Sequence, residues 1–112
     1  VTLPLAHLAE FVESVPSLVP APARVLQFGH VADGNVHVNI LGLDPDDESV
    51  DDAVLQLVAS FGGSISAEHG IGRTRLAELA HYKTQVDLDL MRALKQALDP
   101  AGLLNPGKVV PA

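Results

Sequence analysis

Apolar side chains recur at helical spacing in several parts of this chain. They lie three or four positions apart, so each set falls along one face of a helix. Four segments show this pattern: residues 5–15, 49–61, 74–83 and 87–98. A proline-rich connector follows the first segment, a Gly-Gly pair ends the second, and Asp99-Pro100 ends the last. The pattern therefore predicts four helices.

Strand-like apolar runs lie between the first two predicted helices. Residues 24–29 and 36–43 flank the turn sequence Asp33-Gly34-Asn35, which favours an antiparallel hairpin. Further short strands are expected at residues 1–4 and 64–67. This order of elements predicts an α+β fold in which helices pack on one face of an antiparallel sheet, in a ferredoxin-like arrangement.

Composition narrows the classes of function. The 112 residues include 14 Asp and Glu against seven Lys and Arg, a net charge of -7. This balance argues against nucleic-acid binding and against a polybasic membrane anchor, and no apolar run reaches the length of a membrane span. The chain has no cysteine, which excludes disulfides, thiol nucleophiles and iron-sulfur clusters within it. Absent cysteine fits any compartment, and our expectation is a cytoplasmic protein.

The second predicted strand has one apolar and one polar face. Val36, Val38 and Ile40 alternate with His37 and Asn39. A hairpin would return His30, at the end of the preceding strand-like run, to the neighbourhood of His37. Two imidazoles converging on one open face could form half of a metal site. The alternative is that both are ordinary, partly buried histidines satisfied by backbone groups.

A second candidate cluster is Glu68-His69, which is followed by Gly70 and Gly72. A carboxylate here would complete a set of two histidines and one carboxylate, leaving positions open for substrate. The neighbouring His69 would then be available as an acid or base. The alternative is a carboxylate at a helix N-terminus beside a surface histidine. In the tail, Asn105-Pro106 either stops the chain or aims the Asn105 amide at a ligand.

Three stretches taken together resemble the C-terminal domain of the FAD-linked oxidase family, within the vanillyl-alcohol oxidase superfamily. This group includes D-lactate dehydrogenases, the glycolate oxidase flavin subunit and D-2-hydroxyglutarate dehydrogenase. The stretches are GHVADGNVHVN at residues 29–39, GGSISAEHGIGRTR at 62–75 and LMRALKQALDPAGLLNPGKVV at 90–110. By this resemblance the chain is a partial cap domain, with an α+β body over residues 1–98 and an extended tail over 99–112.

The resemblance implies a role for six positions. His30, His37 and Glu68 would hold a divalent metal, zinc or manganese. His69 would act as base on the substrate hydroxyl. Asn39 would lie against the substrate, and Asn105 would lie near the flavin. The implied reaction is oxidation of a D-2-hydroxy acid of the lactate, glycolate or 2-hydroxyglutarate type, with hydride passing to FAD.

The family binds FAD mainly through a separate N-terminal domain, and its glycine-rich pyrophosphate loop has no counterpart in this sequence. The chain begins at Val1, without a signal-like segment. We therefore expect a fragment that is inactive alone, whose partners are the N-terminal FAD-binding domain and the small 2-hydroxy acid, and which can self-associate through exposed apolar surface. Two alternatives are a stand-alone metal- or ligand-binding module without catalysis and a plain interaction domain with structural histidines.

Overall fold

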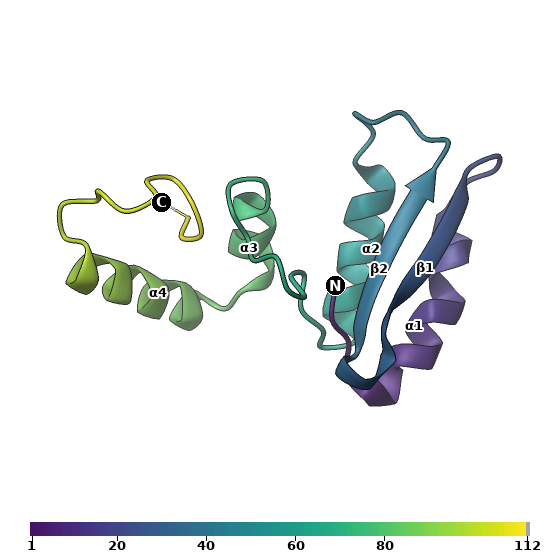
Figure 1. The fold of residues 1–112 in the computed structure, drawn as a ribbon, viewed down its shortest axis with the longest axis horizontal. Helices are drawn as coiled ribbons and strands as arrows, with labels where there is room; N and C mark the ends of the chain where they lie inside the picture. The colour runs from purple at the N-terminus through teal and green to yellow at the C-terminus, as the bar shows by residue number, and fades with distance from the viewer. Residues whose placement is uncertain (112) are drawn as a thin grey trace. The chain divides into compact units, whose positions relative to one another are not determined.

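The computed structural model describes residues 1–111, which form two compact units (Figure 1). Unit 1 is Val1–Ala67, and unit 2 begins at Glu68. A two-stranded antiparallel sheet and four α-helices give the α+β class that the sequence predicts. No helix in the described part of the chain is long and apolar enough to cross a membrane.

The predicted hairpin is the centre of unit 1. Strands β1 (Arg24–His30) and β2 (Asn35–Leu41) pair antiparallel, with Gly29 opposite Val36. A 3-10 turn over Val31–Asp33 joins them and ends at Gly34, whose φ is +68°. A Cβ atom at Gly34 would lie 2.1 Å from the carbonyl oxygen of Leu3, so only glycine fits this corner.

The first predicted helix is shorter than its apolar pattern indicates. Helix α1 covers Leu8–Ser14, and 3-10 turns over Leu5–His7 and Val15–Leu18 flank it. Pro16 has no N–H to donate to a carbonyl four residues earlier, so α-helical bonding cannot continue through it. Helix α2, Ser49–Ser60, agrees with its prediction to within one residue.

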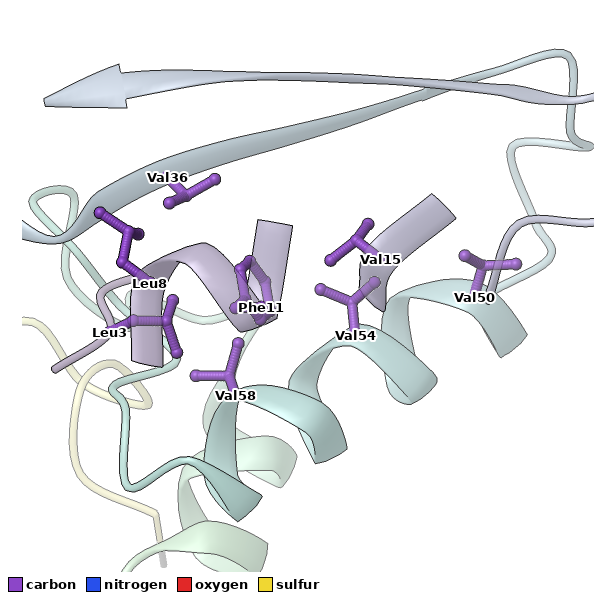
Figure 2. Close-up of a cluster of buried hydrophobic side chains, with 8 residues drawn as sticks. All are labelled: Leu3, Leu8, Phe11, Val15, Val36, Val50, Val54 and Val58. Atoms are coloured by element: carbon purple, nitrogen blue, oxygen red, sulfur yellow. The ribbon is translucent and has the colours of Figure 1, made fainter. Parts of the chain in front are cut away.

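The core of unit 1 lies between the packed face of the hairpin and the two helices, as Figure 2 shows. Three side chains, Phe11, Val15 and Val58, are completely buried. The whole cluster consists of Leu3, Leu8, Phe11, Val15, Val36, Val50, Val54 and Val58. Helical spacing in α1 and α2 and strand alternation in β2 therefore direct their apolar side chains to one core, as the sequence pattern predicts.

The two outer strands of the prediction are reduced to single bridges. Thr2 donates to the carbonyl of Ser64 at 3.0 Å and accepts from its amide at 2.8 Å, and it also bridges Asn35. Among the described residues neither 1–4 nor 64–67 forms a strand. Pro4, which lacks an N–H, prevents the N-terminal segment from continuing the ladder.

Unit 2 contains helices α3 (Leu76–Tyr82) and α4 (Gln85–Leu98). Thr84 caps α4, because its hydroxyl oxygen accepts a hydrogen bond from the Asp87 amide at 3.2 Å. The buried apolar side chains Leu79 and Leu88 come from α3 and α4 respectively. The segment after α4 runs through successive turns and bends, so it is not extended throughout its length.

Candidate functional site

The open face of the hairpin carries three of the predicted site residues. Residues opposite one another in an antiparallel pair project to the same face. The pairs Leu26–Asn39, Phe28–His37 and His30–Asn35 alternate with pairs on the packed face. His30, His37 and Asn39 therefore share the face opposite the core, as strand alternation predicts. His30 and Asn39 are exposed, and His37 is partly buried.

The two histidines of this face lie on diagonal positions. His37 is directly opposite Phe28, and His30 is two residues further along β1. Diagonal neighbours on one sheet face stand about 7–8 Å apart, which long side chains can span. The ring of His37 stacks on that of Phe28, with centroids 5.0 Å apart and an interplanar angle of 17°. Imidazole nitrogens are common metal ligands, and a metal site at these two residues stays a prediction.

Glu68 and His69 lie together at the start of unit 2. The Nε2 atom of His69 is 3.5 Å from Oε1 of Glu68, and the His69 side chain is 86% exposed. Gly70 and Gly72 follow with φ of +74° and +60°, and a Cβ at either position would meet nothing within 4 Å. These glycines therefore serve the backbone conformation of the turn and not a close approach of another group.

Metal-ligating side chains do not gather in a set of three. Within residues 1–111, no group of three or more His, Cys, Asp or Glu side chains could hold a metal ion. Unit 1 supplies His30 and His37, whereas Glu68 and His69 belong to unit 2.

The tail returns to the turn that carries Glu68 and His69. Asn105 has a φ of +47°, and its carbonyl accepts the Lys108 amide at 3.2 Å, closing a turn around Pro106-Gly107. The Val109 amide then donates to the carbonyl of Gly72 at 2.8 Å. Within unit 2, a backbone hydrogen bond thus links the segment that carries Asn105 to the glycine-rich turn.

Asp99, which the sequence predicts only as the end of a helix, is a buried hydrogen-bonding residue in the structure. It is 8% exposed, and its carboxylate accepts the amides of Leu103 and Leu104, each at 2.9 Å. The Lys95 ammonium donates to the same carboxylate and is the largest cause that lowers the pKa of Asp99; the Leu104 amide acts in the same direction. In the sequence, this ion pair is indicated only by the spacing of Lys95 and Asp99, which lie four residues apart at a helix end.

Charge is divided unequally between the two units. Unit 1 contains nine acidic and one basic side chain, a net charge of -8, and unit 2 contains five acidic and six basic, a net charge of +1. The overall acidity of the chain is therefore confined to unit 1.

Unit 1 contains a small apolar pocket between α1 and the hairpin. Its volume is about 190 Å³, and its lining contains neither His30 nor His37. The residues around it are Leu8, Val12, Gln27, Phe28, Gly29, Val31, Asn35 and Val36. This lining does not suit a small dicarboxylate, because it offers no cationic side chain.

Residues 1–109 match the family described as "FAD linked oxidases, C-terminal domain". The chain belongs to this family. It is 38% identical over 97 residues to a D-2-hydroxyglutarate dehydrogenase of Stutzerimonas stutzeri (strain A1501), covering 80% of this chain and 21% of the relative. A probable mitochondrial D-2-hydroxyglutarate dehydrogenase of Oryza sativa subsp. japonica is 36% identical, with 98% and 20% covered.

A D-lactate dehydrogenase of Anaerostipes hadrus is also 36% identical, with 97% of this chain and 25% of the relative covered. The family match confirms the resemblance to FAD-linked oxidases, and these relatives are D-2-hydroxyglutarate and D-lactate dehydrogenases. The chain spans about a fifth to a quarter of their length.

Proposed function

We propose that this chain is the metal- and substrate-binding part of a flavin-dependent dehydrogenase that oxidises a D-2-hydroxy acid. The observation that carries the proposal is the common face of His30, His37 and Asn39, within a chain that matches the FAD-linked oxidase family over residues 1–109. Its relatives include D-2-hydroxyglutarate and D-lactate dehydrogenases, which supports this substrate class.

The proposed metal ligands are His30, His37 and Glu68, the set that the resemblance to the family implies. Two imidazoles and one carboxylate suit zinc or manganese and leave positions for the substrate's hydroxyl and carboxylate. A bound divalent metal would lower the pKa of that hydroxyl, and FAD would supply the hydride acceptor. The exposed imidazole of His69, next to Glu68, would accept the hydroxyl proton.

The two asparagines complete the proposed site. Asn39 shares the open face with both histidines, so its amide can donate to a substrate oxygen held there. Asn105 would lie near the flavin, on a turn tied to the segment after His69. The FAD itself would be bound mainly by an N-terminal domain such as the family has, and the isolated chain is expected to be inactive. A cytoplasmic location stays a prediction.

Calorimetric titration of the chain with Mn²⁺ or Zn²⁺ tests the metal site. We expect one ion per chain, with binding abolished in His37→Ala and unchanged in His81→Ala, which removes an exposed histidine of α3. Absence of metal uptake, or equal losses in both variants, would favour structural histidines and overturn the metal site.

Substrate binding separates a dehydrogenase part from a module without catalysis. Water-proton relaxation of the Mn²⁺-loaded chain should fall when D-2-hydroxyglutarate displaces metal-bound water, and glutarate, which lacks the hydroxyl, should have a smaller effect. Equal effects of the two acids would contradict the hydroxy-acid assignment. Turnover of D-lactate or D-2-hydroxyglutarate by the chain with added FAD and a dye acceptor would contradict its expected inactivity.

A further inference from the structure

The carboxylate of Asp99 organises the first part of the tail. Its two oxygens accept the amides of Leu103 and Leu104, each at 2.9 Å. Lys95, one turn earlier on α4, donates to this carboxylate and also to the carbonyl of Leu104 at 2.5 Å. A charged pair at the end of α4 thereby fixes the two residues directly before Asn105. Hydrogen bonds to charged groups are stronger than those between neutral groups.

A second attachment fixes the other end of the tail. The Val109 amide donates to the Gly72 carbonyl at 2.8 Å, and Nε of Arg92 donates to the carbonyl of Pro111 at 3.3 Å. The segment between the two attachments is the turn around Pro106-Gly107. Gly72 is three residues after His69, so the second attachment acts on the turn that carries Glu68 and His69.

The backbone between these attachments is held in conformations that its residues rarely adopt. Asn105 has a φ of +47° and Val109 a φ of +68°. Asparagine tolerates the left-handed region, but a β-branched residue such as valine is unfavourable there. Such a conformation persists when the surrounding contacts impose it. The hydrogen bond of Val109 to Gly72 is the contact that this conformation permits.

We infer that Asp99 is a positioning residue for the turn that carries Glu68 and His69. Its carboxylate sets the direction in which the chain leaves α4, the Pro106-Gly107 turn reverses that direction, and Val109 then binds Gly72. The position of the proposed base therefore depends on a buried carboxylate thirty residues later in the sequence. The functional meaning of this inference rests on the function proposed above, although the link itself is a property of unit 2.

Amide exchange measured by NMR on the metal-free chain tests the link. In Asp99→Asn we expect the Val109 amide to exchange about tenfold faster or more, because hydrogen bonds to a charged carboxylate are lost. The amide resonances of Glu68, His69 and Gly70 should shift in the same variant. Lys95→Gln, which keeps the carboxylate but removes the ammonium, should give the same changes in smaller measure.

Thr84→Ala is the matched control, because it removes the N-cap at the opposite end of the same helix. If Asp99 acts only by stabilising α4, Thr84→Ala will change the Val109 and His69 amides as much as Asp99→Asn does, and the inference is overturned. It is also overturned if Val109 exchanges faster while the Glu68, His69 and Gly70 resonances stay in place. Neither readout uses metal, flavin or substrate, so a failure of the proposed function would be seen separately, in the Mn²⁺ titration.

Discussion

The imidazole of His37 lies against the phenyl ring of Phe28, its direct partner across the hairpin, with centroids 5.0 Å apart and planes inclined by 17°. Phe28 is 56% exposed, and its neighbour on the same face, Leu26, is 51% exposed. The hairpin therefore presents apolar side chains beside the polar groups of the proposed site. The stack restrains the His37 ring, and the proposed role of His37 requires such a restraint because a metal ligand directs one nitrogen at the metal.

Replacing Phe28 tests this restraint. Stacked aromatic pairs are worth about 0.5–1.5 kcal/mol beyond the area that they bury. Phe28→Leu should therefore weaken Mn²⁺ binding by about three- to tenfold, measured by calorimetric titration. Leu26→Ala is the control, since Leu26 shares the face and faces Asn39 instead. Equal weakening in both variants would show that general apolar surface, and not the stack, supports the histidine.

The corner at Gly34 should be intolerant of any side chain. Gly34→Ala places a Cβ 2.1 Å from the Leu3 carbonyl oxygen, so we expect a loss of about 3 kcal/mol or more in urea denaturation. Gly62→Ala has a similar φ, +70°, but no atom within 4 Å of the added Cβ, and should cost about 1 kcal/mol. Similar losses would mean that backbone conformation alone, without the close approach, selects glycine at residue 34.

The core of unit 1 should respond strongly to loss of volume. Val58 is completely buried, and Val58→Ala removes two methyl groups and leaves a cavity, at a cost of about 2–3 kcal/mol. Val86 of α4 is 77% exposed, and Val86→Ala should change stability by less than about 0.5 kcal/mol. Thermal denaturation followed by circular dichroism measures both. A small effect at Val58 would contradict the described core.

Acid should release the tail of unit 2. The pKa of Asp99 is held below the ordinary aspartate value of about 3.9, so the folded state binds its proton less readily than the unfolded state. Its stabilising contribution is present above that ordinary value and is lost as the pH falls through the lowered one. Exchange protection of the Val109 amide, corrected for intrinsic rates, should fall over that acidic window.

In Asp99→Asn this acid-dependent loss should be absent, because residue 99 no longer titrates. The same variant of Asp47, whose pKa is lowered by Ser49 in unit 1, should leave the Val109 profile unchanged. An unchanged acidic profile in Asp99→Asn would assign the loss to another carboxyl group.

The local sequence pattern was sufficient to predict the polar face of the hairpin. His37 and Asn39 alternate with apolar residues along one strand, and the register places His30 beside them, because two-residue periodicity fixes faces before any tertiary contact forms. The same reasoning was less accurate at the first helix, where 3-10 turns over Leu5–His7 and Val15–Leu18 flank a shorter α-helix. It was also less accurate at residues 1–4 and 64–67, where pairing is limited to single bridges.

The tail shows the opposite case. The sequence indicates that Asp99-Pro100 ends a helix and that Asn105-Pro106 forms a turn, since both are consequences of neighbouring residues. No local pattern joins Val109 to Gly72, which is 37 residues earlier, or directs a buried carboxylate to the amides of Leu103 and Leu104.

By itself the sequence determined the α+β class, the four helices, the hairpin and its polar face, because periodicity and turn chemistry are local. Tertiary structure alone decided how the tail meets the turn of Glu68 and His69, and which conformations Asn105 and Val109 must adopt. The physical reason is that hydrogen bonds between distant segments form only where the chain folds back and brings a donor close to an acceptor. Residue spacing along the sequence does not specify which donor and acceptor pair.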